Sequence, residues 1–268
     1  MHIRSPFPPE IVDAVIDELH DDFTALKRCS LVSNEFRPRS QMHLYSRITI
    51  EFTGPIHHRH PARPFVTVLT PRLGHCVRHL TLVNNVQQWW DHYNDDYFKN
   101  EDYIMPLLFK QLHHLHSFRL ISAGKIMDFG PRHLSPSLQS AVVAMIQKTR
   151  VAELTVQDFV DFPMVSLALT CPHLKELSFR RDDGNVTVAE EILLVPPGIE
   201  IEDKAHLDAL ELDDRAVTSI DILYRMTKLP QARLTLSHLR DLSIIGYEPS
   251  IMACVSKIVL MPPARLNV

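Results

Sequence analysis

Glycine is scarce in this chain, and its few glycines are widely spaced. There are seven in 268 residues, and none lies within five residues of another. A P-loop and a dinucleotide-binding fingerprint both need clustered glycines, because their backbone must approach phosphate groups closely. The G-x-S-x-G pattern of hydrolases and the H-E-x-x-H pattern of zinc enzymes are also missing. The sequence therefore excludes these motif-bearing enzyme classes.

Paired cysteines, an excess of positive charge and long apolar runs are missing too. The four cysteines are isolated, which is typical of reduced thiols and not of disulfide frameworks or zinc sites. The formal net charge of −4 argues against a nucleic-acid partner, which selects a basic face. No run approaches the roughly 18 apolar residues of a membrane span, and the start is not an apolar signal segment. We expect a cytoplasmic or nuclear protein, or one found in both places, with no membrane partner.

Histidine is abundant, with sixteen residues. Two groups stand out, namely His57, His58 and His60, and His113, His114 and His116. Neither group has carboxylate or cysteine partners at metal-ligand spacing. We therefore expect no metal site and no cofactor.

Residues 5–47 are the most informative stretch, and they predict three short helices. The Pro-Pro pair beginning at Pro8 suits a first helical turn, where backbone N–H groups have no intrahelical partner. Asp21 and Asp22 offer caps for a second helix, and Asn34 offers one for a third. The first helix carries apolar residues at helical spacing, namely Ile11, Val12, Val15, Ile16 and Leu19.

Three elements recur in order along these helices, namely Phe7-Pro8-Pro9-Glu10-Ile11, Cys29-Ser30-Leu31-Val32 with Phe36, and His43-Leu44-Tyr45. This ordered set resembles an F-box, by which a substrate receptor docks on the adaptor of a cullin–RING ubiquitin ligase. Phe7 stands where that family usually has Leu, and Phe36 where it often has Trp, but both keep an apolar group. The stretch around residues 37–50 is most similar to F-box proteins of mushroom-forming fungi (basidiomycetes).

The resemblance implies a non-catalytic interaction subunit whose apolar side chains contact the adaptor. The implied adaptor-binding residues are Phe7, Pro8, Ile11, Ile16, Leu19, Leu26 and Val32. Some of them must instead hold the three helices together, and the sequence does not sort them. About forty residues bury little apolar surface alone, so part of this surface should meet something else. Packing on the rest of the same chain is the alternative to a partner.

Residues 48–268 repeat the short pattern apolar-x-x-apolar-x-apolar. Its occurrences are Tyr45/Ile48/Ile50, Val77/Leu80/Leu82, Leu115/Phe118/Leu120, Val151/Leu154/Val156, Leu174/Leu177/Phe179, Leu207/Leu210/Leu212 and Leu239/Leu242/Ile244. The last two positions alternate with polar residues, as in a strand with one buried face. Helices fit between the strands, and the clearest one opens with Ser135 as a cap and Pro136 in the first turn. Further helices are expected near 63–74, 102–114, 162–170, 217–229 and 249–257.

Alternating strands and helices predict an α/β fold with a parallel sheet. Successive middle positions of the pattern are 32, 38, 36, 23, 33 and 32 residues apart, and only Asn85 takes the place of a turn asparagine. Residues 48–268 therefore resemble an irregular leucine-rich-repeat solenoid, with a general α/β domain as the alternative. The expected chain is a three-helix F-box at residues 5–47 followed by a leucine-rich-repeat-like, target-binding domain.

Counting along the pattern places polar side chains on the outer face of the sheet. These are Thr81, Arg119, Thr155, Ser178, Glu211 and Ser243, with Gln157, Arg180 and Asp213 just beyond the strands. Arg119 and Arg180 are the strongest candidates for target contact, because guanidinium groups are frequent at interfaces. A solvated sheet surface is the alternative. A second candidate is an aromatic loop that contains Trp89 and Trp90.

Together these features predict the substrate receptor of an SCF-type ubiquitin ligase. Its helices would bind the SCF adaptor and, through it, cullin, while its repeats would hold an unknown target protein nearby. One alternative is an F-box scaffold without a ligase role. The other is a small enzyme with an unrecognised site.

Overall fold

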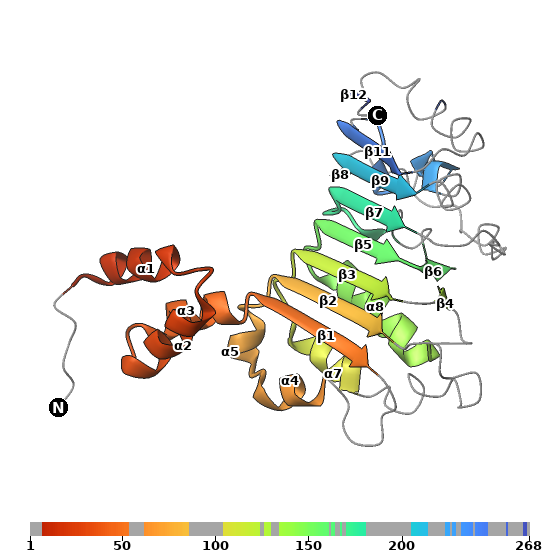
Figure 1. The fold of residues 1–268 in the computed structure, drawn as a ribbon. Helices are drawn as coiled ribbons and strands as arrows, with labels where there is room; N and C mark the ends of the chain where they lie inside the picture. Colours follow the sequence, from red (N-terminus) through yellow and green to blue (C-terminus); the bar gives the residue numbers. More distant parts are fainter. Residues whose placement is uncertain are drawn as a thin grey trace.

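Three short helices lead directly into a sheet of parallel strands (Figure 1). The computed structural model describes residues 7–53, 62–85, 104–123, 126–129, 134–160, 162–163, 167, 170–180, 205–213, 223–225, 227–228, 232–237, 239–245, 256 and 265–266. The α/β class predicted from the sequence is confirmed. No helix among these residues is both long enough and apolar enough to cross a bilayer.

The N-terminal helices are α1 (Pro9–Glu18), α2 (Phe23–Val32) and α3 (Arg37–Leu44). The carboxylate of Asp22 caps α2, because it accepts hydrogen bonds from the backbone N–H groups of Thr24 at 3.0 Å and Ala25 at 2.9 Å. The cap predicted at Asn34 is wrong. Helix α3 starts later, behind Phe36, and no side chain caps it.

These helices have a small core of their own, which we call the helical-module core. Val12, Ile16 and Leu26 are buried in it. Four partly buried side chains pack around them, namely Leu19, Cys29, Phe36 and Leu44. This core is separate from the large core of the rest of the chain in the residues that the structure describes.

Among the described residues, the main sheet has eight strands, and their spatial order follows the sequence. They are β1 (Arg47–Thr53), β2 (His79–Asn85), β3 (Ser117–Ser122), β5 (Glu153–Gln157), β7 (Glu176–Arg180), β9 (Ala209–Asp213), β11 (Asp241–Ile245) and β12 (Arg265–Leu266). Every neighbouring pair is parallel. One parallel strand added per sequence segment is compatible with a solenoid-like fold.

The strand register follows the predicted pattern. The middle positions stand side by side across the sheet as Ile48, Leu80, Phe118, Leu154, Leu177, Leu210 and Leu242. All of them are buried. Two pairs of two-residue strands were not predicted, namely β4 (Met127–Asp128) with β6 (Phe159–Val160) and β8 (Ala205–His206) with β10 (Leu234–Thr235).

A repeated hydrogen-bond pattern stacks the turns that enter the strands. The carbonyl of Ser46, just before β1, accepts hydrogen bonds from the N–H groups of Arg78 at 2.8 Å and His79 at 2.9 Å. The carbonyl of Arg78 accepts in the same way from the next turn. The acceptors continue as His116, Ala152, Lys175 and Asp208. The turns are thus alike although the segments between them differ in length.

The described helices of the larger part are α4 (Arg63–Val68), α5 (Pro71–Gly74), α7 (Ile104–Gln111) and α8 (Pro136–Lys148). Ser135 caps α8 as predicted, accepting a hydrogen bond from the N–H of Leu138 at 3.2 Å. The helix expected near 63–74 is divided at Leu69 and Thr70. Helices expected near 162–170, 217–229 and 249–257 lie mostly outside the described residues.

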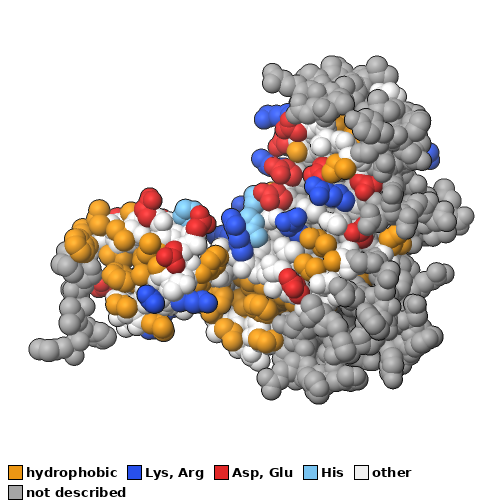
Figure 2. Space-filling model, in the orientation of Figure 1, with side chains coloured by type: hydrophobic (Ala, Val, Ile, Leu, Met, Phe, Trp, Pro, Cys, Tyr) orange, Lys and Arg blue, Asp and Glu red, His pale blue; other side chains and the backbone are white. Residues whose placement is uncertain are grey.

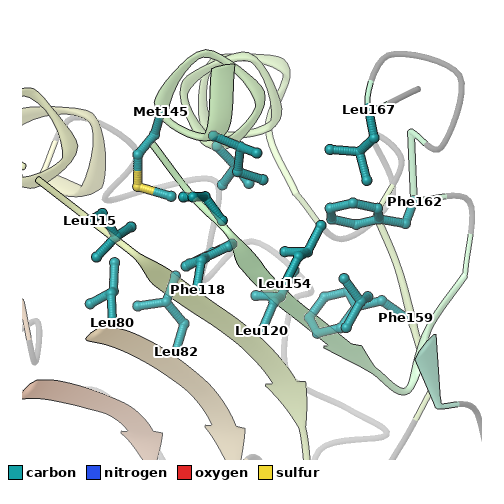
Figure 3. Close-up of a cluster of buried hydrophobic side chains, with 14 of the residues drawn as sticks. Leu80, Leu82, Leu115, Phe118, Leu120, Met145, Leu154, Phe159, Phe162 and Leu167 are labelled. Atoms are coloured by element: carbon teal, nitrogen blue, oxygen red, sulfur yellow. The ribbon is translucent and has the colours of Figure 1, made fainter. Parts of the chain in front are cut away.

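The inward faces of the strands and helices join in one hydrophobic core. Figure 3 shows Phe118 and Leu154 of the sheet below α8, which contributes Met145 to the same cluster. The aromatic rings of Phe129 and Phe162 meet edge to face, with centroids 4.8 Å apart. Among the described residues, the inner face of the sheet is filled in this way, which leaves its outer face as a candidate binding surface.

Candidate functional site

The helical module, α1–α3, exposes an unusual amount of apolar surface (Figure 2). Its side chains that are half or more exposed are Phe7, Ile11, Val15, Phe23, Leu31 and Val32. We call this set the apolar surface of the helical module. Leu31 is 81% exposed, although large aliphatic side chains are normally among the most buried.

The exposed and buried residues of α1 lie on different sides of the helix. Ile11 and Val15 are four residues apart, so they share one face, whereas Val12 and Ile16 share the face that packs on α2. In α2, Phe23 and Leu31 are eight residues apart and also share an exposed face. Helices α1 and α2 therefore each have one apolar face for the core and a second one in solvent.

The structure sorts the predicted adaptor-binding residues. Phe7, Ile11 and Val32 belong to the apolar surface, and Pro8 is exposed beside them in the chain. Others serve the helical-module core instead. Ile16 is 2% exposed, Leu26 is fully buried, and Leu19 packs against them. Val15, Phe23 and Leu31 were missed, although helical spacing from Ile11 points to Val15.

Asp17 joins α1 to α3 beside this surface. Its two carboxylate oxygens accept hydrogen bonds from the guanidinium of Arg39, each at 2.5 Å, and His43 Nε2 lies 2.7 Å from one of them. The hydrogen bonds from Arg39 and then His43 hold the pKa of Asp17 well below its usual range. This polar clamp fixes α1, which carries part of the apolar surface, against α3.

The outer face of the sheet forms the second candidate surface, an open groove of about 550 Å³. Its floor comes from seven strands, β1 to β11, and we call it the sheet groove. The register places one polar row across it, namely Thr49, Thr81, Arg119, Thr155, Ser178, Glu211 and Ser243. The outward positions counted from the sequence are therefore confirmed as a continuous row.

The predicted target-binding residues divide between the groove and its edge. Arg119 and Arg180 are exposed and line the groove. The Arg180 guanidinium pairs with Glu211 on the next strand, with Nε 2.6 Å from the carboxylate. Gln157 and Asp213 are half-buried last residues of their strands and do not line the groove. Trp89 and Trp90 lie outside the described residues.

A second polar row was missed by the sequence analysis. It consists of Arg47, His79, Ser117, Glu153, Glu176, Ala209 and Asp241. Counting two residues back along each strand from the first row would have found it, because side chains alternate with period two. This row carries most of the charge of the groove.

The charge of the sheet groove changes sign along its length. Arg47 and Arg119 lie on β1 and β3, whereas Glu153, Glu176 and Asp241 lie on β5, β7 and β11. Figure 2 shows basic and histidine side chains toward the helical module, and mainly acidic ones with some basic ones among them farther along the sheet. One basic residue of that part, Arg180 on β7, is paired with Glu211. The groove is therefore basic at the β1 end and acidic at the other.

Histidines gather near the basic end. The ring of His75 lies 5.1 Å from that of His113 and 4.9 Å from that of His114, between centroids. Burial, with nearby positive charge from Arg47, lowers the pKa of His79 on the groove floor, while Glu153 opposes that shift. Within the described part of the chain, no three His, Cys, Asp or Glu side chains are placed to hold a metal ion.

Comparison of the chain with protein-family models, with curated proteins and with solved structures gave no match.

Proposed function

We propose that this protein is the substrate-receptor subunit of an SCF-type ubiquitin ligase. The helical module is its F-box and binds the ligase adaptor, and through it cullin. The sheet is a leucine-rich-repeat-like domain that binds a target protein. The chain does no bond chemistry itself, but brings the target close to a ubiquitin-loaded enzyme and so raises its local concentration.

The observation that carries this proposal is the apolar surface of the helical module. Its six side chains expose on the order of 600 Å², at the upper end of what a monomer leaves in water. A stable protein–protein interface covers about 800 Å² on each partner, so this surface has the size of an interface centre. It belongs to the helices whose order resembles an F-box.

The alternative left open by the sequence, packing of this surface on the rest of the chain, is not seen among the described residues. Ile11, Val15 and Leu31 stay exposed although the sheet follows α3 directly. Such exposed apolar side chains favour aggregation unless something covers them. A partner protein is therefore a better explanation for them than an intramolecular contact.

Reconstitution with purified components tests the proposal. The full chain is mixed with the SCF adaptor, then with adaptor and cullin, and each mixture is resolved by size-exclusion chromatography. We expect a one-to-one complex with the adaptor and a ternary complex when cullin is added. A chain that elutes alone in both mixtures contradicts the proposal.

The same experiment separates the scaffold alternative from the ligase subunit. A scaffold without a ligase role binds the adaptor but leaves cullin out. An unrecognised enzyme would show neither complex, and no group of side chains in the described region favours it.

A further inference from the structure

One opposite pair in the sheet groove, Arg180 with Glu211, is neutralised, but the charges at its two ends are not. Neither Arg47 nor Arg119 makes an ion pair within the described part of the chain, and the same holds for Glu176. Strands lie about 4.8 Å apart, so Arg47 on β1 and Glu176 on β7 are separated by about 19 Å. That exceeds the Debye length of about 8 Å at physiological ionic strength, so each end of the groove presents its own charge to a ligand.

The length and shape of the groove select a polypeptide over a small molecule. It crosses seven strands, or six strand spacings, which is about 29 Å. An extended chain of about nine residues spans that distance. The groove is open, and its floor is polar. Midway along it, Ser178 contributes to this floor.

We propose that the sheet groove binds an extended segment of a target protein that is acidic where it crosses β1–β3 and basic where it crosses β5–β11. This inference rests on the proposed function, because it names the chemistry of the target that the receptor would select. A nucleic acid fits worse, since its uniform negative charge would meet the carboxylates of Glu153, Glu176 and Asp241. A uniformly basic tail would meet Arg47 and Arg119.

Labelled synthetic peptides of about nine residues test the proposal with the full chain bound to its adaptor. One peptide has a glutamate block followed by a lysine block, and a second has the blocks in the opposite order, because an extended chain can run either way. A third alternates glutamate and lysine with the same composition, and two more are all acidic or all basic. Fluorescence anisotropy measures each affinity.

We expect one block peptide to bind about tenfold more tightly than the alternating peptide, because alternation places at least two charges opposite like charges. Its affinity should fall as salt is raised. Equal binding of the block and alternating peptides, or tightest binding of a uniformly charged peptide, overturns the proposal. So does a lack of binding by every peptide.

Charge reversal in the groove gives a second, independent readout. The double variant Arg47→Glu with Arg119→Glu makes the groove acidic at both ends, so it should lose the block peptide at least tenfold and gain affinity for the basic one. Adding Glu153→Lys, Glu176→Lys and Asp241→Lys reverses the acidic end as well, while Arg180 stays paired with Glu211, and should restore binding of a block peptide. Unchanged affinities in these variants refute the charge pattern as the selecting feature.

The control reverses two exposed basic residues on the helical side of the sheet, Lys110→Glu with Lys148→Glu, which should leave every peptide affinity unchanged. Adaptor binding is measured on the same samples. If the protein selects a block peptide but does not bind the adaptor, the groove proposal stands and the proposed function is refuted. If it binds the adaptor but selects no peptide, the proposed function stands and the groove proposal is refuted.

Discussion

Replacing Ile11 with Asp should abolish adaptor binding while leaving the fold intact. The side chain of Ile11 is 51% exposed, which is roughly 90 Å² of apolar surface. Covering that area at about 25 cal/mol per Å² contributes about 2 kcal/mol, or about 30-fold in affinity. Aspartate loses this contribution and adds the cost of burying an unpaired charge, which is several kcal/mol more.

The helix itself should tolerate the change. Position 11 lies in the first turn of α1, where a negative side chain interacts favourably with the positive end of the helix dipole. Because the side chain is half in solvent, the free energy of unfolding should change by no more than about 0.5 kcal/mol. Thermal denaturation checks the fold, and isothermal titration calorimetry with purified adaptor checks the affinity.

Two matched variants make the test specific. Val68 on α4 is 50% exposed, so Val68→Asp applies the same chemical change outside the helical module and should bind adaptor normally. Ile16 is 2% exposed, so Ile16→Ala should lose about 2–5 kcal/mol of stability in the module and weaken binding only through unfolding. Wild-type adaptor affinity in Ile11→Asp, or an equal loss in Val68→Asp, would refute the reasoning.

Three further predictions follow from the described contacts. Arg39 depresses the pKa of Asp17, so the ion pair stabilises the helical module above about pH 4 and loses this effect as the pH falls below that value. Asp17→Asn should therefore lower the melting temperature at pH 7. It should also make the melting temperature less dependent on pH in the acid range, as measured by circular dichroism. Phe118→Ala should cost about 3–5 kcal/mol in urea denaturation, because the ring is fully buried between strands and helices; a loss below about 1 kcal/mol contradicts that packing. Burial holds the pKa of His79 below that of a free imidazole, so its ring gains charge only as the pH becomes acidic. Affinity for the block peptide should therefore rise as the pH is lowered, and His79→Gln should remove this rise.

The strands were predictable because their side chains alternate with a fixed period. A slip of one residue would turn Leu80 and Leu82 outward, so the pattern alone fixes which face is buried. The same alternation corrects the position of the inward-facing asparagine. The sequence pattern placed a turn asparagine at Asn85, but β2 continues past Leu82 to Asn85. Its alternation therefore turns Asn84 inward, where Asn84 is 4% exposed and donates a hydrogen bond to the sulfur of Met127.

Features set by tertiary contact were not predictable. The strands β4 and β6 have two residues each, too few for a period to show. Gly74 is required by a close contact between two segments, because a Cβ at this position would collide with the backbone carbonyl of Gln111 at the end of α7. The sequence holds no local signal for such an approach between segments that lie far apart in the chain.

The candidate adaptor surface was predictable only in part, for a geometric reason. Ile11 and Ile16 both belong to the apolar positions of α1, and helical spacing alone does not say which of them faces α2 and α3. That choice depends on how the three helices pack, through contacts such as the clamp between Asp17 and Arg39. Burial then assigns Ile16 to the core and leaves Ile11 in solvent.

The join between the helices and the sheet leads to a last prediction. Only Tyr45 and Ser46 separate α3 from β1, and both ends of this join are tied. The Ser46 hydroxyl donates to the carbonyl of His43 at 2.8 Å, while the Ser46 carbonyl accepts from the next turn of the sheet. The basic end of the sheet groove is therefore the end attached to the helical module (Figure 1).

If the two proposals hold together, this short join fixes the distance from adaptor to target, and a flexible insert should uncouple them. About ten Gly and Ser residues inserted between Tyr45 and Ser46 should leave adaptor binding and peptide binding unchanged when each is measured alone. Ubiquitin transfer to a peptide-tagged acceptor in the reconstituted ligase should slow, because the effective concentration of the acceptor at the enzyme falls. The control insert, of the same length, follows Val268 at the end of the chain and should not change the rate. If ubiquitin transfer proceeds at the wild-type rate with the insert at the join, a rigid connection between the helical module and the sheet is not needed for transfer.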